Sequence, residues 1–167
     1  LSAAELGDPH IVETIRQSLE RKGMLPQELK IELTETVIIE DRATVGDVLE
    51  KLSALGIAIA LDDFGTGYAG LDYLKSLPIS CLKIDKTFVQ EMATSLRSYE
   101  IVQSAINLAW SIGLSTIAEG IEDEDTAQRL NDLNCNIAQG YYFARPMPAS
   151  SVAAWLKQAQ NEDRLSR

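Results

Sequence analysis

Short apolar runs alternate along this chain with segments in which apolar residues recur at helical spacing. Runs that have the length and character of β-strands lie at residues 30–35, 57–61, 81–85, 115–119 and 136–139. Helical stripes are expected at about 11–22, 45–55, 71–77, 101–112 and 127–133, and again from residue 151 onwards. Strands that alternate with helices in this way predict a parallel sheet with right-handed crossovers.

Such a sheet can stay open and be doubly wound, or it can close into a (β/α) barrel. In the strand at 57–61 and its continuation, Ala58, Ala60 and Asp62 share one face, and the intervening positions are large and apolar. Glu32 and its neighbours in the first strand follow the same alternation. Small or polar residues facing inward, with large apolar residues facing outer helices, favour the barrel. We therefore expect an α/β fold, an incomplete (β/α) TIM-type barrel of about five βα units.

Each strand-like run ends in polar residues, and the pair Asp62-Asp63 is the most informative of these ends. Two adjacent carboxylates are unfavourable unless a cation or a basic group stands opposite them. Carboxylate oxygens suit hard divalent cations such as Mg²⁺, and an aspartate shared by two cations is typical of two-metal phosphoryl transfer. The alternative is a solvated Asp-Asp turn followed by a glycine hairpin. In a barrel, the carboxyl ends of the strands form the active-site face.

Composition and charge narrow the function classes. The 167 residues suit one globular domain, and the formal net charge of −10 argues against a nucleic acid polymer or anionic lipid as partner. An anionic phosphate substrate would therefore need bound cations. Cys81 and Cys135 lack metal-ligand spacing, and the single histidine, His10, excludes a multi-histidine metal site. No apolar run is long enough to span a membrane, so we expect a cytoplasmic protein without membrane contact.

Five stretches together resemble the EAL-type cyclic di-GMP phosphodiesterase domain. They are Glu32-Leu33-Thr34-Glu35, Asp62-Asp63-Phe64-Gly65-Thr66-Gly67-Tyr68, Leu82-Lys83-Ile84-Asp85, Ala118-Glu119-Gly120-Ile121-Glu122, and Gln139-Gly140-Tyr141-Tyr142-Phe143 with Arg145-Pro146. They follow the order and spacing of that family. The resemblance implies a (β/α)₈ barrel that hydrolyses cyclic di-GMP to linear pGpG with two Mg²⁺ or Mn²⁺ ions.

The resemblance also implies residue roles. Glu32, Asp62 and Asp63 would bind the metals, with Asp62 bridging both. Lys83 would hold or polarise the attacking water, and Glu119 would be the general base or a water-mediated metal partner. Groups around the metals or on the substrate side would be Gln139, Glu122, Asp85, Arg145 and Pro146. Glu35 would brace a regulatory loop that couples dimerisation to metal and substrate binding, formed by Phe64, Gly65, Thr66, Gly67 and Tyr68.

Several of these residues have structural alternatives. Glu35 and Glu122 could be acids at helix N-termini, where the helix dipole favours negative charge. Asp85 could pair with Lys83 or Lys86. The aromatic run at 141–143 could be a hydrophobic plug or could offer ring surface to a guanine base.

The sequence also departs from the family pattern. The Glu-Ala-Leu tripeptide and a metal-binding asparagine are not among these residues, and Ala69-Gly70 stand where the family often has serine. We expect residues 1–159 to be a partial EAL domain with a polar tail at 160–167, and the chain alone to have little or no activity. Two alternatives remain: a sensor that binds cyclic di-GMP without cleaving it, and an α/β protein that acts on another phosphate ester. A homodimer, and sensory or GGDEF-type domains upstream in a longer protein, are the expected partners.

Overall fold

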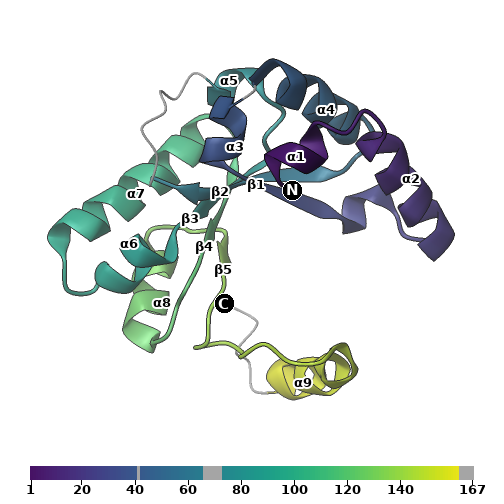
Figure 1. The fold of residues 1–167 in the computed structure, drawn as a ribbon. Helices are drawn as coiled ribbons and strands as arrows, with labels where there is room; N and C mark the ends of the chain where they lie inside the picture. The colour runs from purple at the N-terminus through teal and green to yellow at the C-terminus, as the bar shows by residue number, and fades with distance from the viewer. Residues whose placement is uncertain (41, 66–72, 162–167) are drawn as a thin grey trace.

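The computed structural model describes residues 1–40, 42–65 and 73–161, and Figure 1 shows how their elements are arranged. The described strands form one parallel sheet in the order β1-β2-β3-β4-β5. Their bounds are β1 (Lys30–Thr34), β2 (Ala58–Phe64), β3 (Cys81–Ile84), β4 (Ser115–Ala118) and β5 (Ile137–Ala138). Because each strand pairs with the next one along the chain, the sheet has no point at which the strand order reverses, as a doubly wound sheet would. The predicted α/β fold, an incomplete barrel of about five βα units, is confirmed.

Helices precede, connect and follow these strands. They are α1 (Ala3–Leu6), α2 (Ile11–Lys22), the 3₁₀ helix η1 (Pro26–Glu28), α3 (Glu35–Glu40), α4 (Arg42–Ala54), α5 (Tyr73–Ser76), α6 (Lys86–Glu91), α7 (Leu96–Ser111), α8 (Glu124–Asp132) and α9 (Ala149–Asn161). The glycine signals mark helix ends as expected: Gly23 takes a left-handed conformation with φ 63° directly after α2. Asp123 caps α8 by accepting a hydrogen bond from the Thr126 amide at 2.8 Å.

The two faces of the sheet carry different side chains. The large apolar residues of the strands, such as Ile59, Leu61 and Leu82, pack with the helices in the main hydrophobic core. On the opposite face Ala60, Cys81 and Ile117 form a separate small buried cluster. The strand register explains why this cluster forms, because Ala60 pairs with Cys81 in the neighbouring strand and alternate residues of a strand point to the same side of the sheet. The predicted inward face of small side chains is therefore observed.

Some boundaries differ from those expected. The pattern did not predict α1, α3 or α6, which are short and bury few side chains of their own. Glu35 begins α3 instead of ending β1, and β2 continues through the aspartate pair to Phe64. The predicted helix at 71–77 is described only as α5, since residues 71 and 72 lie outside the described residues.

The last helix, α9, stands apart from the sheet beyond β5 (Figure 1). It ends at Asn161, and residues 162–167 of the expected polar tail lie outside the described residues. In the described part of the chain, no helix combines the length and apolar character that crossing a membrane requires.

Candidate active site at the carboxyl ends of the strands

A buried lysine on β3 gathers three carboxylates at the carboxyl-terminal edge of the sheet. Lys83 Nζ lies 2.7 Å from Glu32 Oε2, 3.0 Å from Asp62 Oδ1 and 2.7 Å from Glu119 Oε1. Only 6% of the lysine side chain is exposed, whereas the carboxylates are 44%, 24% and 22% exposed in the same order. Four side chains that are distant in sequence thus meet at one point, which is open to solvent on the acidic side.

Strand register explains why these four side chains meet. Lys83 pairs with Ile117, and Glu119 comes two residues after Ile117 on the same face. Glu32 pairs with Ala60, and Asp62 lies two residues after Ala60. Neighbouring parallel strands therefore deliver all four side chains to the inner face, near their carboxyl ends. The sequence analysis placed Glu32 and Asp62 correctly on this face.

The carboxylates keep Lys83 charged. Burial alone would lower the pKa of the ammonium, but hydrogen bonds to Glu119, Glu32 and Asp62 outweigh burial and raise the pKa above its ordinary value. Lys83 is therefore a permanent cation at neutral pH, and it does not supply a free amine as a base.

Asp63 occupies a bulge in β2. Its φ is +55°, a left-handed conformation that aspartate adopts more readily than most residues, and the pairing with β3 shifts register between Leu61 and Phe64. Without this extra residue, strict alternation would turn Asp63 toward the outer core. Burial, followed by the charges of Asp62 and Asp85, raises the pKa of Asp63 against the opposing effect of Lys83. The bulge thus keeps both aspartates of the pair on the acidic edge.

Asp85 has a structural role in addition to its place beside Asp63. It is the N-cap of α6 and accepts a hydrogen bond from the Thr87 amide at 2.9 Å. In the described part of the chain, the Asp85 carboxylate caps α6 and forms no ion pair with Lys83 or Lys86. The Asp-x-Thr spacing at the start of α6 was the sequence signal for it.

Glu35 directly follows β1 and is hydrogen-bonded to a tyrosine that the sequence analysis missed. It is 5% exposed, and its Oε1 accepts a hydrogen bond from the hydroxyl of Tyr73, itself buried in α5, at 3.0 Å. Its Oε2 is buried and has no hydrogen-bond partner among the described residues. Burial and the nearby carboxylate raise the pKa of Tyr73. Glu35 does begin a helix, as its structural alternative supposed, but it is also one half of a buried polar pair.

Parts of the expected regulatory loop can be placed. Gly65 has φ +97°, and a side chain there would meet the ring of Phe88. Phe64 is half-buried and packs against the main core. Thr66, Gly67 and Tyr68 lie outside the described residues.

The segment after β5 continues the sheet by backbone pairing. The backbone N–H of Gln139 donates to the backbone carbonyl of Ala118 at 2.9 Å, and the backbone N–H of Ile121 donates to the backbone carbonyl of Gln139 at 3.2 Å. Gly140 lies so close to the Ile121 backbone that any side chain at position 140 would collide with it. Gln139 therefore lies opposite Glu119 in the continued pairing of β4 with β5.

The other predicted residues make no described contact with the Lys83 cluster. Glu122 precedes the N-cap of α8 and accepts a hydrogen bond from Gln90 at 3.0 Å, a contact that the sequence analysis did not foresee. The guanidinium of Arg145 stacks over the ring of Tyr141 at 4.8 Å. Pro146 is exposed.

The donor chemistry of this edge fits a hard divalent cation. Glu32, Asp62 and Asp63 supply carboxylate oxygens, the ligands that Mg²⁺ and Mn²⁺ prefer, and the crowding of Asp62, Asp63 and Asp85 is the kind that a cation relieves. Within the described ranges, however, no three acidic, histidine or cysteine side chains surround a common point at which an ion would sit. The carboxylates of Glu32, Asp62 and Glu119 converge on the Lys83 ammonium instead.

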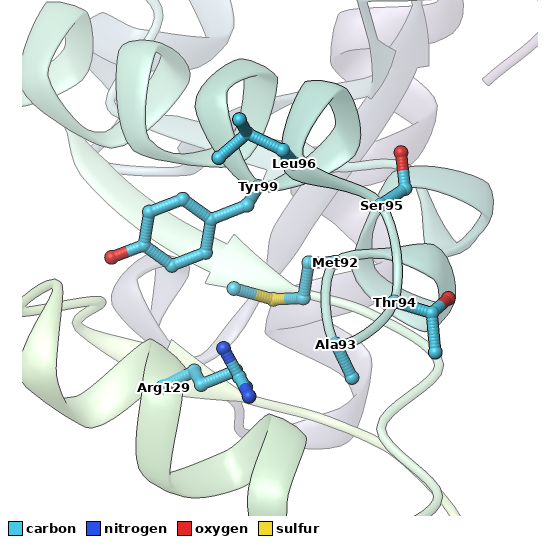
Figure 2. Close-up of a pocket in the computed structure, with 7 residues that line it drawn as sticks. All are labelled: Met92, Ala93, Thr94, Ser95, Leu96, Tyr99 and Arg129. Carbon is cyan, nitrogen blue, oxygen red and sulfur yellow. The ribbon is translucent and has the colours of Figure 1, made fainter.

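A pocket on the helical side of the sheet is separate from this site. It lies between the α6–α7 connection and α8, where the thioether of Met92 lies between Tyr99 and Arg129 (Figure 2). Arg129 is paired with Asp125 of its own helix at 2.9 Å. None of the residues that line this pocket belongs to the acidic edge.

Comparisons with known proteins indicate the family to which this chain belongs. The model of the EAL domain family matches residues 1–146. The chain is 41% identical over 145 residues to the cyclic di-GMP phosphodiesterase RocR of Pseudomonas aeruginosa, covering 87% of this chain and 37% of RocR. It is 40% identical over 154 residues to MucR of the same organism, a bifunctional diguanylate cyclase and cyclic di-GMP phosphodiesterase, covering 92% of this chain and 22% of MucR.

Solved structures show the same fold. The MucR phosphodiesterase in complex with c-di-GMP superposes with a TM-score of 0.87 at 40% identity, over 91% of this chain and 62% of that one. A manganese and cyclic di-GMP complex of BlrP1 from Klebsiella pneumoniae gives a TM-score of 0.79 at 31% identity, over 85% of this chain and 36% of BlrP1. The chain thus spans well under half the length of RocR and MucR. With the family model matching most of its residues, the chain belongs to the EAL domain family.

Proposed function

We propose that this chain contributes its acidic edge to a metal-dependent phosphodiesterase that hydrolyses cyclic di-GMP to linear pGpG. The observation that carries the proposal is the convergence of Glu32, Asp62 and Glu119 on Lys83 at the strand ends. The relatives RocR and MucR are named as cyclic di-GMP phosphodiesterases, and the MucR structure contains c-di-GMP. Both observations support the same substrate.

Glu32, Asp62 and Asp63 are the residues that would hold two Mg²⁺ or Mn²⁺ ions in this proposal. Bound divalent ions would lower the pKa of a water molecule and neutralise the charge of the phosphodiester. The net charge of −10 makes this neutralisation important, because the protein as a whole repels a nucleotide anion. The BlrP1 complex with manganese and cyclic di-GMP supports the choice of cation.

Lys83 and Glu119 would act on the attacking water and on the phosphate. Glu119 uses Oε1 for Lys83, so its Oε2 is the atom that would accept the proton of the water as general base. The fixed ammonium of Lys83 would hold or polarise the attacking water and would also stabilise negative charge that develops on the phosphate oxygens. Gln139, opposite Glu119, and Arg145, beside Tyr141, would help to position the water and the substrate.

Three further proposals follow the expectations from the sequence. Residues 1–159 form the part of the EAL domain present here, and the 167-residue chain alone turns over little or no cyclic di-GMP. Glu35 and the loop from Phe64 to Tyr68 couple the site to a homodimer contact. In a longer protein, sensory or GGDEF-type domains would control the activity, as the bifunctional name of MucR suggests for that relative.

An assay on a complete domain that contains this segment tests the proposal. We expect Mg²⁺- or Mn²⁺-dependent formation of pGpG from cyclic di-GMP and no comparable release of phenol from an aryl phosphate. Binding of cyclic di-GMP without turnover would identify the domain as a sensor. Comparable turnover of the aryl phosphate would indicate a less specific phosphoesterase.

A further inference from the structure

The carboxylates around Lys83 carry more negative charge than its ammonium neutralises. Glu32, Asp62 and Glu119 bring three negative charges and Lys83 brings one positive charge, so the cluster has a net charge of −2. Charges this close interact strongly where burial limits screening by water, and the lysine side chain is only 6% exposed. Without Lys83, three carboxylates would lie together on the inner face with no cation between them.

Lys83 occupies one oxygen of each carboxylate. Its partners are Glu32 Oε2, Asp62 Oδ1 and Glu119 Oε1. The Asp62 Oδ1 atom also accepts the Asp63 amide at 3.1 Å. Within the described part of the chain, the second oxygen of each carboxylate receives no hydrogen bond, and all three carboxylates are partly exposed. A cation arriving from solvent can therefore approach them without first displacing the lysine.

We propose that Lys83 is an internal counter-ion of this site: its ammonium holds the three carboxylates together when no divalent cation is bound, and it competes electrostatically with such a cation for their charge. Lys83 thereby organises the metal ligands before the metal binds, and at the same time limits the affinity for the metal. The competition rests on the metal site of the proposed function, whereas the counter-ion role does not depend on any metal.

A thermodynamic cycle in the presence of a chelator tests the counter-ion role. The natural 167-residue chain, Lys83→Met, Glu119→Gln and the double variant would be unfolded with urea, with Lys51→Met as a control for an exposed lysine. We expect Lys83→Met to lower the urea concentration at the midpoint of unfolding, and Lys51→Met to leave this concentration nearly unchanged. Adding Glu119→Gln to Lys83→Met should raise the midpoint again, because the double variant has the natural cluster charge of −2.

The counter-ion role is decided by whether Glu119→Gln raises or lowers the urea midpoint when it is added to Lys83→Met. If Glu119→Gln destabilises equally with and without Lys83→Met, the counter-ion role is wrong. If Lys83→Met does not fold, folding of the double variant supports the role, and failure of both variants to fold contradicts it.

Calorimetric titration with Mn²⁺ tests the competition, with no substrate present. We expect Lys83→Met to bind Mn²⁺ at least about tenfold more tightly than the natural chain, because a like charge beside the ion has been removed. Unchanged or weaker binding would overturn the competition while leaving the metal site intact. Binding to neither protein would overturn the competition and show that the carboxylates of this chain do not hold the ion without the rest of the domain.

Discussion

Replacing Tyr73 by phenylalanine removes the tyrosine hydroxyl group and should destabilise the fold without changing the surface of the protein. Tyr73 is 3% exposed, and its hydroxyl donates to Glu35 Oε1 at 3.0 Å. Glu35 Oε2 already lacks a partner among the described residues. Tyr73→Phe would therefore leave both oxygens of this buried carboxylate without a hydrogen bond from those residues. A hydrogen bond to a charged group contributes about 1.5–3 kcal/mol, so we expect a loss of about 2 kcal/mol in the free energy of unfolding.

Thermal unfolding followed by circular dichroism measures this loss. For a chain of this length, about 2 kcal/mol corresponds to a fall in Tm of about 4–8 °C. Tyr141→Phe is the matched control, since it removes the same hydroxyl from a ring that is 53% exposed. The control should change Tm by less than about 2 °C, as surface substitutions usually do.

A second substitution separates the hydrogen bond from simple packing. Adding Glu35→Met to Tyr73→Phe replaces both polar partners by apolar side chains and should recover most of the lost stability. Equal Tm values for Tyr73→Phe and Tyr141→Phe would refute the reasoning. A further loss on adding Glu35→Met would show that Glu35 stabilises the protein through contacts other than Tyr73.

Three other predictions concern the strand ends and the association of the chain. Gly140→Ala should lower Tm clearly more than Gly7→Ala in the same thermal assay, because a side chain at 140 collides with the Ile121 backbone whereas one at 7 meets only ordinary contacts. In a complete domain, Lys83→Ala should lower kcat more than it raises KM for cyclic di-GMP; a rise in KM alone would make Lys83 a simple phosphate-binding group. Light scattering should find the 167-residue chain at least dimeric, since β1 and β5 each have only one strand neighbour in the described sheet; a cooperative monomer would contradict this.

The sheet was predictable because its signal is local. Alternation in β1 and β2 identified the inner face, and that face proved to carry Glu32, Ala60 and Asp62. The short helices were not predictable in the same way. The residues of α3 include Val37 and Ile38, which have β-branched side chains typical of strands, and the helix is too short to show a periodic stripe.

The partners within the site needed the three-dimensional structure. Lys83 is 51 residues from Glu32, and no pattern along the chain shows that their side chains are 2.7 Å apart. The bulge at Asp63 likewise depends on the pairing of two strands, although an aspartate is one of the residues that tolerates its positive φ. The hydrogen bond from Tyr73 to Glu35 was not predicted, because a tyrosine in an apolar segment is usually only part of the core.

The role proposed for Asp62, as one of the residues that would hold the metal ions, gives the most direct test of the site. Hydrolysis of cyclic di-GMP would be followed by chromatography of pGpG, using a complete domain that contains this segment and its Asp62→Asn variant, each with Mn²⁺ and with chelator. We predict that the unsubstituted domain forms pGpG only with the metal, and that Asp62→Asn lowers the rate by at least about 100-fold while Tm changes little. A rate near that of the unsubstituted domain in Asp62→Asn, or equal turnover in chelator, would contradict a metal-dependent site built on these carboxylates.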